Sequence, residues 1–332
     1  MTLGVATKER IGTDGRVGSA ERLGGIGGPP RQARRAEDPW RTAHALVRLA
    51  RPRQWIKNLL VAVAPLAGGV LLHPHTLLVT AGAFVVFCLA AAGTYAVNDA
   101  LDVELDRIHP DKVRRPVASG ALTPSAAIAA GACWLGGAAA LAWALAGWRL
   151  FAVVGSYIAI TIAYSRWLKH EPVVDLLCVS AGFVLRAAGG GVATHVALST
   201  WFLLVISFGA LLIVCGKRSG ELAELGDLDT RHRPALKSYP ATFLQSARVV
   251  ALSGALVAYC LWAFERSVHG AHRGHALLFE LSVVPVIFVL LRLELLFQSG
   301  HGSAPEELAL HDRTLQIAGI AWVAVFALGV YA

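Results

Sequence analysis

Four oxygen-bearing side chains recur at helical spacing between residues 98 and 106. If one helix covers this stretch, Asn98, Asp102 and Asp106 lie on one face at intervals of four residues, and Asp99 lies beside them. Carboxylates stacked in this way repel each other unless a cation lies among them. Hard oxygen ligands suit Mg²⁺, which keeps several waters and is completed by substrate phosphates. The spacing therefore predicts either a Mg²⁺ site or a solvated helix end that carries ordinary surface acids.

A basic cluster follows the acidic stretch directly and favours the metal interpretation. Sites that bind a di- or triphosphate usually combine a metal ion with Lys and Arg side chains. For any one of these cations, contact with lipid headgroups is an equally good explanation. The cluster consists of Lys112, Arg114 and Arg115.

The composition places these residues in a membrane protein. Of the 332 residues, 55% are hydrophobic and 16% are charged, whereas a soluble domain carries about a quarter charged residues. The apolar residues form long blocks, which excludes a disordered chain, a disulfide-stapled secreted module and a β-barrel porin. A net charge of +8 is typical of basic cytoplasmic loops, so we expect a membrane environment and no nucleic-acid partner.

The apolar blocks predict an all-α fold, because lipid cannot satisfy exposed backbone groups and each block is near the ~20 residues that cross the hydrocarbon. Residues 1–39 are Gly-rich and charged, which predicts a disordered cytoplasmic tail before a transmembrane domain over 40–332. The nine predicted transmembrane helices cover residues 58–72, 77–97, 123–146, 149–165, 173–194, 200–216, 243–264, 276–297 and 314–332.

Lys and Arg residues concentrate on one side of these predicted spans. The side that carries the segments 98–121 and 217–241 holds most of them, whereas the opposite side offers only Arg149, Arg266 and Arg273. The positive-inside rule makes the basic side cytoplasmic. We therefore expect a multi-pass protein of the cell membrane whose acidic stretch faces the cytoplasm.

Two charged residues lie within the predicted span 173–194. Asp175 and Arg186 share nearly one helix face but are ~16 Å apart along the axis, so they cannot pair directly. Charges inside a span are costly and indicate function by default, although Asp175 could simply lie at the membrane interface. We expect Arg186 to orient a phosphate in the cavity or to hold a polar network.

The stretch 98–106 reads NDALDVELD and matches the NDxxDxxxD signature of the UbiA-type superfamily of intramembrane prenyltransferases. The blocks RPRQWIKN, HPDKVRRPVASG, YSRWLK and GFVLRAAGG narrow the resemblance to one branch of that superfamily. This branch transfers phosphoribose to a polyprenyl phosphate in the arabinose-donor pathway of the actinobacterial cell wall. The resemblance covers residues 48–332.

The resemblance implies a helical fold that encloses a cytoplasm-facing cavity open to lipid. It implies Mg²⁺-dependent transfer from 5-phosphoribosyl 1-diphosphate to decaprenyl or another polyprenyl phosphate. Asn98, Asp102 and Asp106 are the implied catalytic residues, and together with Asp99 they would hold the metal and the diphosphate. Three anionic groups in one pocket need further cations. The resemblance and the charge inventory together give these candidate substrate contacts: Lys57, Asn58, Lys112, Arg114, Arg115, Tyr164, Lys169, Asp175, Arg186, Lys217 and Arg218.

Two departures from the family pattern leave alternatives open. Tyr164 and Lys169 are spaced YxxxxK where many members have YxxxK. After residue 216 the chain continues with Lys217 and Arg218, where members that use prenyl diphosphates carry a second acidic motif, although Glu221 could still be a metal ligand. The alternatives are a prenyltransferase that joins a polyprenyl diphosphate to an aromatic acceptor, and a non-catalytic lipid transporter. A homo-oligomer is also left open.

Overall fold

The computed structural model describes residues 39–110, 112–225, 238–269 and 276–331. Every regular element in these ranges is a helix, which confirms the all-α class. Residues Pro39–Ala332 form one compact unit, and the predicted tail over 1–39 lies outside the described residues except for Pro39. The elements are α1 Pro39–Ala50, η1 Pro52–Ala62, α2 Val63–Ala67, α3 Pro74–Leu101, α4 Val103–Ile108, η2 Lys112–Arg114, α5 Pro124–Arg166, η3 Leu168–His170, α6 Val174–Ala193, α7 Thr200–Leu225, α9 Ala241–His269, α10 Ala276–Leu281, α11 Val283–Gln298, α12 Pro305–His311 and α13 Arg313–Tyr331.

Seven helical segments within the described ranges are long and apolar enough to cross a membrane. They are α3, α5, α6, α7, α9, the α10–α11 pair and α13. The chain is therefore a multi-pass membrane protein, as the sequence predicts. The predicted number of nine spans is not confirmed, because two of the predicted spans fall within α5 and the first falls on η1 and α2.

The 43-residue helix α5 is a hairpin of two arms rather than one rod. The backbone leaves helical geometry at Ala146 and at Gly147, whose φ of 63° favours glycine. A Cβ on Gly131 of the first arm would lie 3.3 Å from the Ala96 Cβ, near the end of α3, and Leu145 packs on Gly82 near its start. The first arm therefore runs antiparallel to α3. The second arm returns beside it, since Leu150 and Tyr157 pack in one cluster with Phe87 of α3, and the two arms correspond to the two spans that the sequence predicts.

The segment predicted as the first span is a 3₁₀-helix followed by one short α-helix. A 3₁₀-helix rises ~2.0 Å per residue, so η1 and α2 together extend over roughly 30 Å, about the hydrocarbon thickness. The backbone of η1 touches α6 directly, since a Cβ on Gly190 would overlap the carbonyl oxygen of Val61. Only glycine allows this close approach.

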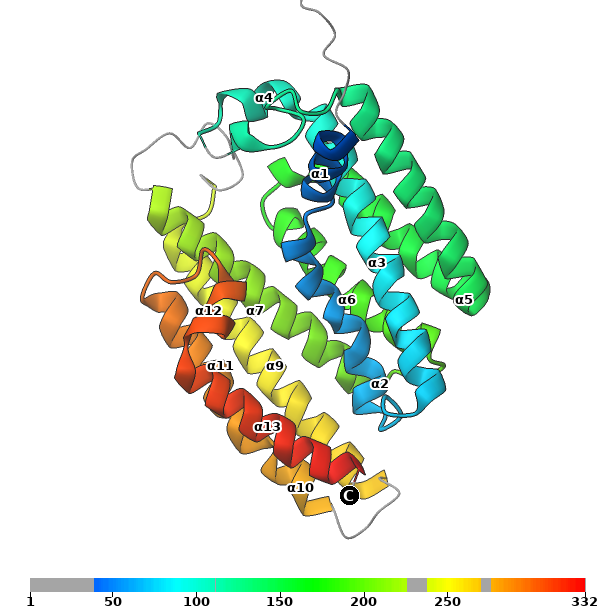
Figure 1. Ribbon diagram of the computed structural model, residues 1–332. Helices are drawn as coiled ribbons and strands as arrows, with labels where there is room; N and C mark the ends of the chain where they lie inside the picture. The colour runs from blue at the N-terminus through cyan, green and yellow to red at the C-terminus, as the bar shows by residue number, and fades with distance from the viewer. Residues whose placement is uncertain (1–38, 111, 226–237, 270–275, 332) are drawn as a thin grey trace, which may run out of the picture. The chain divides into compact units, whose positions relative to one another are not determined.

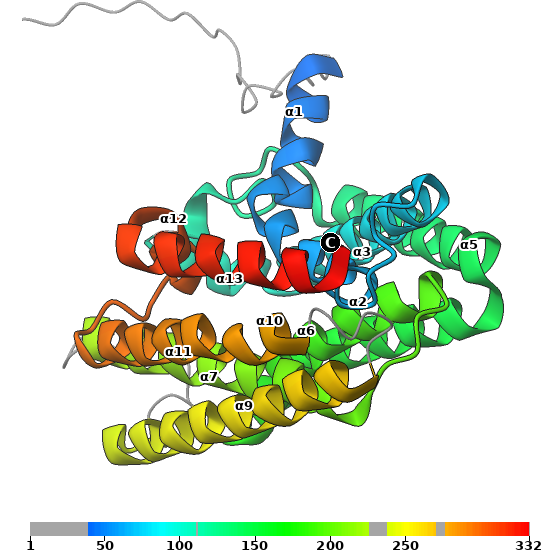
Figure 2. The ribbon, with the colours of Figure 1, turned by 90° about the horizontal axis from the view of Figure 1, so that it is seen from below.

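Helix α6 lies between two groups of helices (Figure 1). On one side, α3 and α5 bury an apolar cluster that includes Phe87, Leu150 and Tyr157. On the other side, α7, α9, α10 and α13 bury an aromatic cluster that includes Trp262 and Phe326. Figure 2 shows the α10–α11 pair between α13 and α9 in this second group. The polar residues of α6 thus face helices from both groups.

A buried ion pair that the sequence does not reveal joins the second group. Arg248 of α9 is 4% exposed and donates from Nε to Glu294 Oε2 of α11 at 3.0 Å and from Nη2 to Oε1 at 3.1 Å. Arg248 also donates to the hydroxyl of Ser219 in α7. Charged residues inside two apolar spans were the available signal for this pair.

We expect Glu294→Leu to destabilise the fold by about 3–5 kcal/mol, because it leaves the charge of Arg248 buried without its partner. Replacing both Arg248 and Glu294 by Leu should recover most of this loss. Thermal unfolding in detergent measures both effects. Glu280→Leu, at an exposed position in α10, is the matched control, and equal midpoints for the two single variants would contradict this prediction.

Candidate active site

The acidic stretch folds as two helices, not as one. Helix α3 ends at Leu101, and Asp102 follows with φ −93° and ψ 11° before α4 begins. The expected single stripe of Asn98, Asp102 and Asp106 is therefore wrong in its geometry. The break redirects the chain, so that Asp99 and Asp106 meet one partner and Asp102 meets another.

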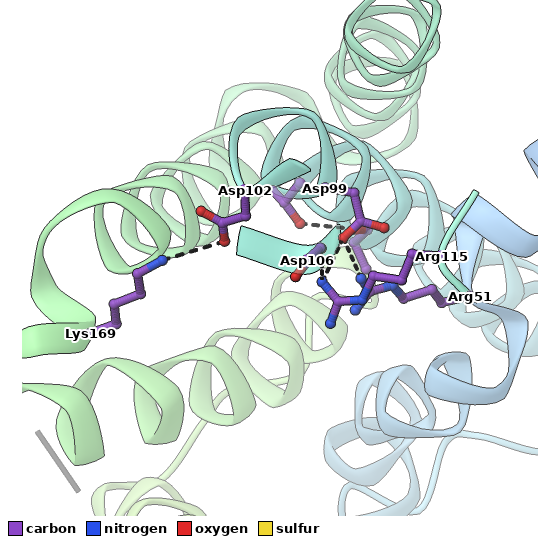
Figure 3. A network of polar contacts seen from close by, with 8 residues as sticks. Arg51, Asp99, Asp102, Asp106, Arg115 and Lys169 are labelled. Carbon is purple, nitrogen blue, oxygen red and sulfur yellow. Dashed lines mark hydrogen bonds and ion pairs between the residues drawn. The ribbon is translucent and has the colours of Figure 1, made fainter. Parts of the chain in front are cut away.

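Arg115 joins Asp99 to Asp106 (Figure 3). Its Nη1 donates to Asp106 Oδ2 at 2.7 Å and to Asp99 Oδ1 at 3.1 Å. Both carboxylates are almost fully buried, at 2% and 1% exposure. Arg51 also donates to Asp99 Oδ1, while its guanidinium lies 4.8 Å from the ring centre of Tyr95. We call Arg51, Asp99, Asp102, Asp106, Arg115 and Lys169 together the Asp–Arg network.

Arg51 has a backbone conformation that only a constrained site maintains. Its φ of 51° and ψ of 61° are left-handed, and it immediately precedes Pro52 at the start of η1. Such a conformation costs on the order of 1–3 kcal/mol in a residue other than glycine and is found where surrounding contacts enforce it. Here the contact is the ion pair with Asp99. Arg51 is the first residue of the RPRQWIKN block, but no site role was predicted for it from the sequence, so this contact was missed.

Asp102 pairs with Lys169, which follows the second arm of α5 in η3. The Lys169 Nζ lies 3.4 Å from Asp102 Oδ2, and both side chains are about a quarter exposed. This separation exceeds the ~2.7–2.9 Å of a tight charge-assisted hydrogen bond. Asn98 lies one turn before Asp102, and its carbonyl accepts the Asp102 N–H at 2.9 Å. The predicted residues Asp102 and Lys169 are thus brought together at a partly accessible edge of the network, and the contact of Asn98 is a backbone bond of the helix.

The donor atoms of the Asp–Arg network fit a hard divalent cation. Carboxylate oxygens are the ligands that Mg²⁺ prefers. Asp99 Oδ2 is buried and, within the described ranges, has no hydrogen-bond partner, so it retains the capacity to coordinate. Among the described residues, no group of three or more His, Cys, Asp or Glu is arranged to hold a metal. A metal would therefore share these carboxylates with Arg51, Arg115 and Lys169.

A second charged cluster surrounds Arg218 of α7. Its Nη2 donates to Asp175 Oδ1 at 2.9 Å and its Nε donates to Asp175 Oδ2 at 3.0 Å. This is a bidentate ion pair between buried groups. The same guanidinium donates to the hydroxyl of Tyr164 at 3.0 Å and to Glu221 Oε2 at 2.7 Å. The structure thus brings together Tyr164, Asp175 and Arg218, which are predicted site residues from three helices. Glu221, an open candidate for a metal ligand, pairs with Arg218.

Tyr239 supports this Arg218 cluster and was not anticipated from the sequence. Its hydroxyl accepts the backbone N–H of Val173 at 2.6 Å, just before α6 begins. Burial raises the pKa of the Tyr239 hydroxyl, which stays neutral near pH 7. The contact fixes the entry of α6, and therefore the position of Asp175.

Arg186 holds a polar network deep in the bundle. Its Nε donates to Asn58 Oδ1 at 2.7 Å, its Nη2 to the Tyr157 hydroxyl at 2.9 Å and its Nη1 to the Gly182 carbonyl at 2.7 Å. Asn58 is fully buried and also donates to Cys88 Sγ at 3.2 Å. Of the two expectations for Arg186, the polar network is the one that these contacts support. Asn58 and Arg186 thus lie together, separate from the Asp–Arg network.

The remaining predicted cations lie on the segments that flank the two clusters. Lys57 donates to Gln54 Oε1 at 2.7 Å within η1. Lys112 and Lys217 are partly buried, and Arg114 is exposed with its carbonyl bound by Arg48 at 2.6 Å.

Comparison with known proteins identifies the family and the relatives that this chain resembles. Residues 59–329 match the UbiA prenyltransferase family. A decaprenyl-phosphate phosphoribosyltransferase of Corynebacterium glutamicum is 39% identical over 301 residues, 90% of each chain. The protein of that name from Mycolicibacterium smegmatis is 38% identical over 308 residues, 89% of this chain and 95% of its own. The structure of a UbiA homologue from Archaeoglobus fulgidus bound to DMAPP and Mg²⁺ is similar with a TM-score of 0.65 at 16% identity, covering 86% of this chain and 98% of that one, which is a likeness of fold.

Proposed function

The chain belongs to the UbiA prenyltransferase family, and we propose that it acts as a decaprenyl-phosphate phosphoribosyltransferase. It transfers 5-phosphoribose from 5-phosphoribosyl 1-diphosphate to decaprenyl phosphate, giving decaprenylphosphoryl-5-phosphoribose and diphosphate for synthesis of cell-wall arabinan. The single observation that carries this proposal is 39% identity to an enzyme of that name along 90% of both chains.

The Asp–Arg network is the proposed site for the departing diphosphate. Asn98, Asp99, Asp102 and Asp106 would hold Mg²⁺, which supplies charge neutralisation for the diphosphate when it is bound. Arg51 and Arg115 already face these carboxylates and can donate to diphosphate oxygens from the same positions. Lys112 and Arg114 follow α4 on the adjoining segment and add positive charge.

The Arg218 cluster is the proposed site for the other two phosphates. Lys169 belongs to the Asp–Arg network through its pair with Asp102 and lies five residues before Val174, where α6 begins, so it connects this network to the helix that carries Asp175. Lys169, Lys217 and Arg218 can bind the 5-phosphate of the donor and the phosphate of the lipid, while Asp175 and Tyr164 orient Arg218. Asn58 and Arg186 would fix η1 against α6 and thereby position Lys57.

In this arrangement a phosphate oxygen of the lipid attacks the anomeric carbon of the ribose. The bond from that carbon to the diphosphate oxygen breaks, and diphosphate leaves with the bonding electrons. The attacking phosphate is already anionic, so no general base is needed. The residues contribute by holding two anions close together and by stabilising the leaving group.

Donor choice separates this proposal from its main alternative, a prenyltransferase that uses a polyprenyl diphosphate. With Mg²⁺ present, 5-phosphoribosyl 1-diphosphate should raise the thermal unfolding midpoint of the purified protein in detergent. Geranyl diphosphate at the same concentration lacks the 5-phosphate and should give a smaller shift. The opposite order of the two shifts would contradict the proposed donor.

The active site is proposed to face the cytoplasm, since the cations of both clusters gather at the end of α3 that holds the acidic stretch. In a chain whose native cysteines are replaced, Ser119→Cys should resist an impermeant thiol reagent in intact cells, and Ala197→Cys should react. Both positions are exposed, one after α4 and one between α6 and α7. The reverse labelling pattern would show that the orientation is inverted.

A further inference from the structure

A cavity of about 320 Å³ lies far from both charged clusters, between α2 and the last turns of α9. Its volume is at the lower end of the ~300–1,000 Å³ typical of small-molecule sites. Helix α2 leads into the start of α3, whereas the Asp–Arg network lies at the other end of that helix, about 40 Å away. In Figure 1, α2 and α4 lie at opposite ends of the bundle. We call this space the α2–α9 cavity.

The wall of the α2–α9 cavity is largely apolar, and its polar side chains are Ser199, whose Oγ accepts the Phe202 N–H at 3.2 Å, and a charged pair at one edge. Residues 196–199 and Phe202 line one side, and Trp262 lines another. Glu265 and Arg266 supply the charged edge. Arg266 donates from Nη2 to the Ala67 carbonyl, but its Nε is buried and, among the side chains that the structure describes, has no hydrogen-bond partner. An unpaired buried donor of a cation is costly, and an anionic group in the cavity would satisfy it.

An aromatic slot of about 110 Å³ adjoins this cavity and shares Ala67, Phe202 and Trp262 with it. The Tyr259 hydroxyl, the main polar group of the slot, is already bound by Trp322 Nε1 at 2.6 Å and lies 2.8 Å from Ser282 Oγ. The slot therefore presents only apolar surface, which suits a hydrocarbon chain. An anionic edge site beside an apolar slot is the arrangement that an amphiphile requires.

The depth of Arg266 agrees with a lipid headgroup. From Ala241 to Arg266, α9 rises about 38 Å, which exceeds the ~30 Å of bilayer hydrocarbon. If α9 begins near the membrane surface on the side of the Arg218 cluster, Arg266 lies at the opposite headgroup layer. A lipid of that leaflet can reach the cavity with its phosphate at the level of the guanidinium.

We infer that the α2–α9 cavity binds a glycerophospholipid of the surrounding bilayer. Its phosphate lies at Arg266, the hydrogen-bond donors of its head group lie at Glu265, and one acyl chain follows the aromatic slot. The carboxylate of Glu265 selects a head group that can donate, such as the ammonium of phosphatidylethanolamine, over phosphatidylcholine. This inference does not depend on the proposed transferase activity.

Native mass spectrometry of the purified full chain, titrated with phosphatidylethanolamine in detergent, tests the inference. The wild type should bind one molecule of phosphatidylethanolamine, and bind it more tightly than phosphatidylcholine. Arg266→Gln should weaken the binding of phosphatidylethanolamine at least about tenfold. Ala197→Trp, which places a bulky ring at the exposed rim of the cavity, should also weaken it. Arg149→Gln removes an exposed arginine that does not line the cavity and should leave binding unchanged.

Equal binding by the wild type and Arg266→Gln would overturn the inference, as would an equal loss in Arg149→Gln, which indicates general charge attraction. If Arg266→Gln does not fold, Ala197→Trp decides the question alone. Added polyprenyl phosphate should not displace the bound phospholipid. Displacement would mean that the cavity serves the acceptor lipid and would likewise overturn the assignment to a bilayer lipid.

Discussion

Asp106→Asn should lower kcat by at least about 10²–10³-fold while the protein still folds. The substitution keeps the size of the side chain and an oxygen that can accept from Arg115, but it removes the charge that we propose for metal and diphosphate binding. Asp102→Asn should have a comparable effect, because Asp102 lies on the accessible edge of the network. Steady-state turnover and the unfolding midpoint, measured on the same preparations, separate loss of chemistry from loss of fold.

Glu104→Gln is the matched control for both Asp variants. Glu104 lies in α4 between the two aspartates, its side chain is 79% exposed, and its partner is the neighbouring Arg107. Neutralising it should leave turnover within about twofold of the wild type, since exposed pairs of this kind contribute little. Near-normal turnover in either Asp variant would remove the acidic stretch from the proposed active site.

Substitutions at Asp175 and Arg218 should separate folding from donor binding. Arg218→Leu should cost about 3–5 kcal/mol of stability, because it leaves the Asp175 carboxylate buried without its cation. The double variant Asp175→Leu/Arg218→Leu should recover much of this stability. It should still show a KM for 5-phosphoribosyl 1-diphosphate about ten- to a hundredfold above the wild type, since a charge-assisted contact to phosphate is missing.

Lys217→Ala provides the comparison on the same turn of α7. Lys217 is proposed to bind phosphate and is only partly buried, whereas Arg218 is buried, so Lys217→Ala should raise the donor KM with a smaller loss of stability than Arg218→Leu. A normal donor KM in the double variant Asp175→Leu/Arg218→Leu would mean that Arg218 only holds α6 and α7 together. A selective rise in the KM for the lipid would instead assign this end of α7 to the acceptor.

The sequence predicted the helical class and the location of the chemistry because both depend on local patterns. Apolar blocks near 20 residues long require helices in lipid, and the acidic stretch is contiguous in the chain. The turn inside α5 was also predictable, since Gly147 separates the two apolar blocks over 123–146 and 149–165. The first span was harder, because a 3₁₀-helix covers the same distance with fewer residues.

The pairing within the site could not be predicted from spacing. A helical stripe assumes continuous geometry, whereas Asp102 leaves it and turns Asp106 toward Arg115. The contacts of Arg51 with Asp99 and of Arg218 with Asp175 join residues 48 and 43 positions apart, which no periodic pattern specifies. Each of these charges was visible as a polar residue near or within an apolar span, but its partner became visible only in the fold.

The most direct test of the central claim follows the ribose itself. Purified protein is incubated with Mg²⁺, decaprenyl phosphate and 5-phosphoribosyl 1-diphosphate that is radiolabelled in the ribose, and the products are partitioned between water and organic solvent. The account predicts that label enters the organic phase as a phosphoribosyl lipid, that diphosphate appears in equal amount, and that Asp106→Asn abolishes both. Label that stays in the aqueous phase, while the same preparation joins a polyprenyl diphosphate to an aromatic acceptor, would contradict it.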